Sequence, residues 1–219
     1  MPSDTNDPGP LPPPPPPSPP VPSPHDPREL RAALFGPVRA MDLVLTEKRR
    51  FLVTLTDDRS GWLLVAVLFL TSLVFTIPYG LVLGIERPWR VAALFLGSVT
   101  ICLPSLLVFS GYVGLGVAAR RNLGLALVVT AVAALFTFGF FPILWFLALT
   151  MDGGTLVTTH GISVGLLAVS LSAGLLRLEG CLGQVRESDR NGACPRLVTT
   201  WMILVIFICH RMALLLELL

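Results

Sequence analysis

Charged residues are scarce in this chain, at 14% of its 219 residues, whereas an ordinary soluble domain has about a quarter. The formal net charge of +2 is too small to indicate nucleic acid as a partner. Hydrophobic residues instead make up 53% of the chain, and its mean hydropathy is +0.74. This composition excludes an ordinary soluble domain and indicates a membrane protein.

The chain also has few groups suited to catalysis or metal binding. Cys102 and Cys209 fall within apolar runs, while Cys181 and Cys194 lie in a loop expected to face the reducing cytoplasm. No CxxC pair or Cys/His cluster has metal-ligand spacing. No serine with a paired base, aspartate pair or histidine metal motif occurs within the apolar runs. We therefore expect no disulfide, metal or cofactor, and no enzymatic activity.

The N-terminus lacks the basic start and apolar core of a signal peptide. Residues 1–27 hold most of the prolines, including the run 12–17, and almost nothing apolar to bury. Such a segment is predicted to be a disordered, proline-rich tail, extended in polyproline II where it is ordered. It is either an unselective spacer or a ligand for the aromatic groove of a cytosolic protein.

Long apolar runs make up most of the remainder. The run GWLLVAVLFLTSLVFTIPYGLVLG contains no charge and is long enough to cross about 30 Å of hydrocarbon. Four more runs follow it. The sequence therefore predicts an all-α membrane protein, with one bundle of about five transmembrane helices over residues 61–219. The predicted spans are about 61–84, 91–118, 123–149, 156–176 and 197–219.

Residues 28–60 form a basic, amphipathic juxtamembrane segment. Asp26, Pro27 and Glu29 predict the N-cap, the first helical position and the capping-box partner of a helix. The Gly36-Pro37 pair predicts a break between one helix and a second. The segment either lies in the headgroup region, with its cations toward anionic lipid, or packs on the cytoplasmic mouth of the bundle.

Basic residues are distributed unevenly between the two sides of the predicted bundle. One side carries the basic segment, Arg120 and Arg121, and the arginines between the fourth and fifth spans. The other side has only Arg87 and Arg90. The positive-inside rule therefore predicts a cytoplasmic N-terminus and an external C-terminus in the cell (inner) membrane.

The last predicted span contains a candidate intramembrane polar site. His210 and Arg211 fall near its middle, and Glu217 lies on the same helical face. A cation at that depth is costly and usually has a partner, which we expect on another helix or another subunit. Two alternatives remain: Arg211 snorkels to the interface, or the last helix does not cross completely.

Prolines and glycines within the spans are candidate kink and packing positions. Gly80 and Gly84 form a small-xxx-small pair that favours close approach of another helix. A proline inside a span predicts a kink, which is either structural or lines a substrate path. The candidate positions are Pro78, Gly80, Gly84, Pro104, Gly111 and Pro142.

Several short motifs occur in a characteristic order: PYGLVLG ends the first span, the second contains ALFLGSVTICLPSLLVFSGYVG, and the third contains FGFFPILWF. On these motifs, residues 35–219 resemble a family of small, largely uncharacterised bacterial multi-pass membrane proteins, some labelled WASP-homology actin-binding proteins. Helix number and size are also similar to the five-helix Ypt-interacting membrane proteins. The resemblance implies the fold and a cell-membrane location. It transfers no catalytic residue, and the tail has no basic actin-binding signature.

Two functions remain open on these grounds. The small number of intramembrane polar groups favours a non-enzymatic scaffold or accessory subunit. Its expected partners are the bilayer with its anionic inner leaflet, a cytosolic protein at the proline-rich tail, and a membrane protein or second copy of the chain. The alternative is a small permease or transporter component for an apolar or lipid-like solute, with Pro104, Pro142 and His210/Arg211 along its path.

Overall fold

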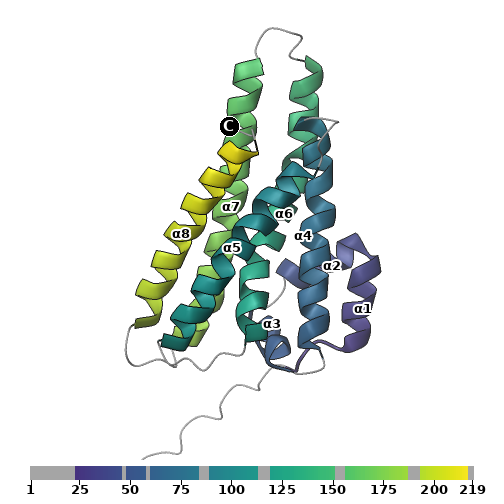
Figure 1. Ribbon diagram of the computed structural model, residues 1–219. Coiled ribbons are helices and arrows are strands. Elements are labelled where there is room, and N and C mark those ends of the chain that lie inside the picture. The colour runs from purple at the N-terminus through teal and green to yellow at the C-terminus, as the bar shows by residue number, and fades with distance from the viewer. Residues whose placement is uncertain are drawn as a thin grey trace, which may run out of the picture.

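The computed structural model describes residues 23–45, 48–57, 60–83, 89–112, 119–150, 156–186 and 193–216, which form an all-helical fold (Figure 1). Most of the predicted tail, residues 1–22, lies outside the described residues. The helices are α1 (Pro27–Phe35), α2 (Pro37–Leu45), α3 (Lys48–Thr56), α4 (Gly61–Leu83), α5 (Arg90–Tyr112), α6 (Ala119–Thr150), α7 (Leu156–Arg186) and α8 (Ala193–Leu215).

Helix α1 begins and ends where its sequence signals predict. Asp26 is the N-cap, and its Oδ1 accepts a hydrogen bond of 2.9 Å from the backbone N of Arg28. Pro27 occupies the first turn, where a missing N–H costs nothing because that group has no helical acceptor. Gly36 has extended backbone angles and separates α1 from α2, which confirms the predicted break.

Glu29 does not take the predicted capping-box role. Its Oε2 instead lies 3.3 Å from Nδ1 of His25 and 3.3 Å from Nη2 of Arg50, on α3. The backbone N of His25 also donates to Oγ1 of Thr54, at 2.9 Å. These contacts join the start of α1 to α3, so Glu29 links two helices rather than capping one.

Helices α1, α2 and α3 together form what we call the N-terminal platform. Leu30 of α1 and Leu55 of α3 are fully buried, in one hydrophobic cluster with Leu64 of α4 and Val128 of α6. The platform therefore packs on the bundle, beside the lower half of α4 in Figure 1. This arrangement agrees with the second sequence alternative, and it contains three helices rather than the one or two predicted.

Four helices of the described residues are long and apolar enough to cross a membrane, with candidate spans Gly61–Val82, Arg90–Val108, Ala119–Thr150 and Gly161–Glu179. The fifth predicted span corresponds to a shorter apolar helix, Thr199–Leu215. Trp62 and Trp89 are 60% and 58% exposed near the starts of α4 and α5, at opposite ends of the bundle. Tryptophan favours membrane interfaces, so helix length, composition and these two residues support a multi-pass membrane protein.

Some helix ends differ from the predicted span limits. Helix α7 continues to Arg186, beyond the limit predicted at residue 176. It passes through Arg177, whose Nη2 donates to the backbone oxygens of Val44 and Leu45 at 3.3 Å. Those carbonyls are at the end of α2, where they receive no hydrogen bond within that helix. Arginine is a good helix former, so α7 continues past it.

Other predicted limits fall where the chain is not described or shift by a few residues. Helix α6 begins at Ala119, earlier than the predicted residue 123. The predicted span residues 84, 113–118 and 217–219 lie outside the described residues.

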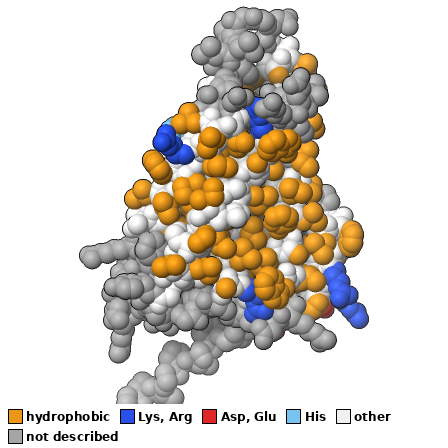
Figure 2. Space-filling model, viewed as in Figure 1, with side chains coloured by type: hydrophobic (Ala, Val, Ile, Leu, Met, Phe, Trp, Pro, Cys, Tyr) orange, Lys and Arg blue, Asp and Glu red, His pale blue; other side chains and the backbone are white. Residues whose placement is uncertain are grey.

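Helix α6 is central and contacts α2, α3, α4, α5 and α7. Each of its residues from Gly124 to Leu135 is buried. Helices α5 and α8 pack on one another at one side of the bundle, while α6 and α7 extend past the other helices at its upper end (Figure 1). Hydrophobic side chains cover the middle of the visible face, with Lys or Arg side chains toward its two ends (Figure 2).

Candidate functional site

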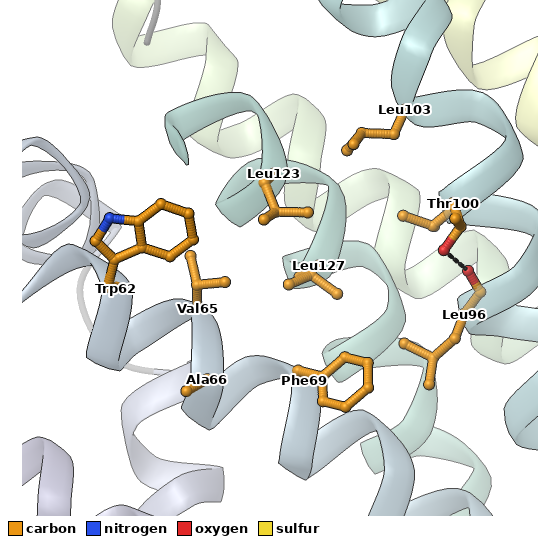
Figure 3. Close-up of a pocket in the computed structure, with 10 residues that line it drawn as sticks. Trp62, Val65, Ala66, Phe69, Leu96, Thr100, Leu103, Leu123 and Leu127 are labelled. Carbon is orange, nitrogen blue, oxygen red and sulfur yellow. Dashed lines mark hydrogen bonds between the residues drawn. The ribbon is translucent and has the colours of Figure 1, made fainter. Parts of the chain in front are cut away.

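An apolar groove lies between α4, α5 and α6 (Figure 3). It has a volume of about 340 Å³. Ten residues line it, four from α4, four from α5 and two from α6. Trp62 and Phe69 mark its extent along α4, and Leu123 and Leu127 form its floor on α6. A groove of this size is at the lower limit of ligand pockets, about 300 to 1,000 Å³.

The lining of the groove offers almost nothing to a polar ligand. Thr100 is its one side chain with a hydroxyl, and that group already donates to the backbone oxygen of Leu96 at 2.7 Å (Figure 3). Trp62 and Phe69 are 60% and 49% exposed, so the groove opens toward the surroundings of the bundle. At the depth of the spans those surroundings are lipid, and the groove is therefore suited to a hydrocarbon chain.

The end of the groove nearest Trp62 is also the end at which α4 and α6 begin, and arginines lie there. Arg120 and Arg121 occupy the first turn of α6. A Cβ placed on Gly61, at the start of α4, would be 2.9 Å from Nε of Arg120, which puts this side chain beside the residue preceding Trp62. Nε of Arg121 is buried and has no hydrogen-bond acceptor among the described residues.

The helix starts add positive potential at this end. Neither α4 nor α6 has an acidic residue in its first turn, and the N-terminus of a helix carries roughly half a positive charge. Asp57 precedes α4, and its Oδ2 accepts a hydrogen bond of 3.0 Å from the backbone N of Ser60. Arg120 and the N-termini of α4 and α6 thus lie together at this end of the groove, an arrangement that favours an anion.

The residues of the predicted polar site in the last span are placed as follows. His210 and Arg211 are exposed on α8. They lie within about 8 Å of the residue at which α8 ends, Leu215, at 1.5 Å per residue. Glu217 lies outside the described residues. This position near a helix end is where an arginine can snorkel to the interface.

The predicted kink and packing positions are spread over three helices rather than brought together. Helices α4, α5 and α6 continue through Pro78, Pro104 and Pro142 respectively. Pro104 and Pro142 are exposed, and Pro78 is partly buried. Gly80 is buried, as a packing role requires, whereas Gly111 is exposed with open space around it. Gly84 lies outside the described residues.

Two glycines outside the predicted packing positions make the closest helix contacts. A Cβ on Gly174 of α7 would overlap the backbone oxygen of Val129 of α6, and a Cβ on Gly124 of α6 would overlap the side chain of Leu55. Their burial is the only signal that separates them from exposed glycines such as Gly165, and burial follows from the packing rather than from the local sequence.

Polar side chains inside the described bundle are satisfied mostly within their own helices. Ser72 Oγ donates to the backbone oxygen of Leu68 at 2.8 Å, and Thr76 and Ser98 make similar bonds. Ser72 also meets Thr130 across the α4–α6 interface, with 2.9 Å between the two hydroxyl oxygens. Bonds of this kind support packing and do not form a continuous polar route through the described part.

Trp201 of α8 donates from Nε1 to the backbone oxygen of Cys102 on α5, at 3.2 Å, close to Pro104. Trp201 is 1% exposed. The Trp201→Phe variant should lower the free energy of unfolding by about 1 kcal/mol, because it removes one buried hydrogen bond and keeps most of the ring packing. Chemical unfolding in detergent, followed by circular dichroism, measures this loss.

The matched control for that variant is Trp145→Phe, because Trp145 of α6 is 52% exposed. If both variants unfold at the same denaturant concentration, the α5–α8 hydrogen bond does not contribute to stability.

Comparison of the chain with protein-family models, with curated proteins and with solved structures found no match.

Proposed function

We propose that this protein is a non-enzymatic membrane scaffold or accessory subunit, in which the bundle holds the N-terminal platform and the proline-rich tail at a fixed place on the membrane surface. One observation carries the proposal: the platform and the bundle share a single hydrophobic cluster. An amphipathic segment that only rested on lipid would not need such a cluster.

The attachment is supported at several points along the platform. Leu30 and Leu55 are fully buried in the shared cluster. Arg177 of α7 donates to backbone oxygens at the end of α2, where a cation also complements the helix dipole. A partner that binds the chain ahead of Ser23 would therefore be held next to the bundle rather than at the end of a free helix.

The filled centre of the bundle favours a scaffold over a carrier of polar solutes. Helix α6 is buried continuously from Gly124 to Leu135, and Gly174 brings α7 directly against its backbone. Among the described residues, His210 and Arg211 lie on the outside of α8 rather than along an internal path.

The orientation in our proposal has the platform end in the cytoplasm of a cell (inner) membrane. Nine described arginines belong to the platform, the start of α6 or the second half of α7, whereas Arg90 and Arg211 lie toward the other end. The positive-inside rule favours this orientation. The nine are Arg28, Arg31, Arg39, Arg49, Arg50, Arg120, Arg121, Arg177 and Arg186.

Co-purification in mild detergent tests the scaffold. The intact chain should retain a stoichiometric partner, identified by mass spectrometry. With a chain that begins at Ser23, the amount of co-purified partner should fall to background. Ser23 is the appropriate start because His25 and Asp26 bond to the platform and cap α1. A full-length chain with serines at positions 12–17 keeps the length of the tail but lacks the proline run. If this variant also loses the partner, the prolines are what the partner binds.

The control is Arg211→Leu, which changes an exposed residue of α8 far from the platform. It should retain the partner. If the chain that begins at Ser23 retains the partner and Arg211→Leu loses it, the result contradicts the scaffold and favours a function of the bundle itself.

The apolar groove favours a second candidate, a small permease or transporter component for an apolar or lipid-like solute. Such a solute needs few polar groups, and the groove provides a lining of that kind. Reconstituted vesicles distinguish the two functions: transport that survives removal of residues 1–22 supports the permease, and a partner lost with those residues supports the scaffold.

A further inference from the structure

We propose that the groove between α4, α5 and α6, together with Arg120 at its end, is a binding site for one phospholipid with an anionic headgroup. The acyl chain lies in the groove, and Arg120 binds the phosphate. This inference does not depend on the scaffold proposal, because it concerns a ligand of the bundle.

The shape of the groove fits a hydrocarbon chain. It extends from Trp62 to Phe69 along α4, which is about 10 Å at 1.5 Å per residue. A transmembrane helix of a partner is itself about 10 Å wide, and a 10 Å length of it occupies more than twice the groove's volume of about 340 Å³. An acyl chain is narrower and would displace no polar contact, since the hydroxyl of Thr100 is already bonded within α5.

The charge at the end of the groove fits a phosphate. On a helix of 3.6 residues per turn, Arg120 lies on the same face as Leu123 and Leu127, the two groove residues of α6. Arg120 also lies against Gly61, next to Trp62. Along α6, the arginine at headgroup level is therefore followed by the apolar residues of the groove. A phospholipid has the same order, with its phosphate at headgroup level and its acyl chain below it.

The helix N-termini beside Arg120 add to the positive potential. Arg120 lies against Gly61 at the start of α4 and is itself in the first turn of α6, and the N-terminus of a helix carries roughly half a positive charge. An arginine offers several donors in a fixed fork and commonly binds phosphate through two of them.

Native mass spectrometry of the purified full chain tests the site. The protein is incubated with equal amounts of phosphatidylglycerol and phosphatidylcholine that carry identical acyl chains, and the retained lipids are counted. We expect phosphatidylglycerol to be retained about tenfold over phosphatidylcholine, because hydrogen bonds to a charged partner are the stronger kind. Arg120→Gln should bring the two lipids close to parity.

A blocked groove gives an independent variant. Ala66 lines the groove and is exposed, so Ala66→Trp should fill it and reduce retention of both lipids several-fold. The controls are Ala168→Trp, at an exposed position of α7, and Arg211→Gln on α8; both should behave as the unchanged chain. Because Ala66→Trp leaves Arg120 intact, it decides the question if Arg120→Gln fails to fold.

Three results would overturn the site. Equal retention of the two lipids by the unchanged chain removes the headgroup preference. Undiminished lipid retention in Ala66→Trp shows that the acyl chain does not occupy the groove. Displacement of the lipid by soluble glycerol phosphate at the same concentration shows that Arg120 binds free phosphate and that the groove adds no affinity.

Discussion

Replacing Gly174 with alanine is expected to lower the free energy of unfolding by about 3 kcal/mol, at the upper end of the usual cost of overpacking. The added Cβ would overlap the backbone oxygen of Val129, and a backbone atom cannot rotate away as a side chain can. Helices α6 and α7 would have to separate along their contact. In a bilayer, helix association depends on such close packing, since lipid is as apolar as the helix surface. Thermal unfolding in detergent measures the loss.

Gly165→Ala is the matched control on the same helix. A Cβ at Gly165 has open space around it, and alanine favours the helix over glycine by about 1 kcal/mol, so the control should be neutral or slightly stabilising. If Gly174→Ala unfolds at the same temperature as Gly165→Ala, the close contact between α6 and α7 does not exist in the folded protein.

The long helices could be predicted from the sequence because the signal is the absence of charge over a membrane thickness. That signal requires no knowledge of neighbours, and four runs correspond to helices long enough to span. Helix ends are set partly by neighbours. Arg177 ends the apolar run in the sequence, yet α7 continues through it because arginine is a good helix former, and its guanidinium reaches carbonyl acceptors on α2. The last span was predicted at 197–219, whereas the described apolar helix is Thr199–Leu215.

The placement of the platform could not be predicted because its pattern satisfies two surroundings equally. An apolar stripe with arginines opposite it fits a lipid surface and also fits the side of a bundle. Leu55 identifies the second arrangement only through its contact with Gly124, which is 69 residues later in the chain. The capping box could not be predicted correctly for the same reason. The local pattern predicts that the carboxylate of Glu29 caps α1, whereas this carboxylate contacts His25 and Arg50 instead.

The candidate sites differ in how far local sequence could indicate them. His210 and Arg211 stand out as charged residues in an apolar run, but their exposure depends on how α8 packs. The groove has no sequence signature, because its residues come from three helices and none is unusual in a membrane span. The sequence predicts Arg120 only as part of a loop between two spans, and its position beside Gly61 follows from the parallel packing of α4 and α6, which begin at the same end of the bundle.

Replacing Leu55 with alanine is expected to weaken docking of the platform by about 3 kcal/mol, as for other fully buried leucines. Local opening of α1–α3 would then become more frequent, and amide hydrogen exchange in these helices should accelerate about a hundredfold while the bundle changes little. Leu45→Ala is the control, because that side chain on α2 is 54% exposed. Exchange that accelerates equally in α1–α3 and in α6 would show that platform and bundle unfold as one unit.

The contact between Leu55 and Gly124 makes a sharper test through a double-mutant cycle. Gly124→Ala alone should destabilise the platform, because its Cβ would overlap the side chain of Leu55. In the Leu55→Ala background the added methyl group enters space that the leucine side chain has left. The loss of stability caused by Gly124→Ala should therefore largely disappear. Residues in contact commonly show coupling of about 0.5 to 3 kcal/mol. Additive effects would mean that α3 does not lie on α6, and the platform would then be free to rest on lipid instead of being held by the bundle.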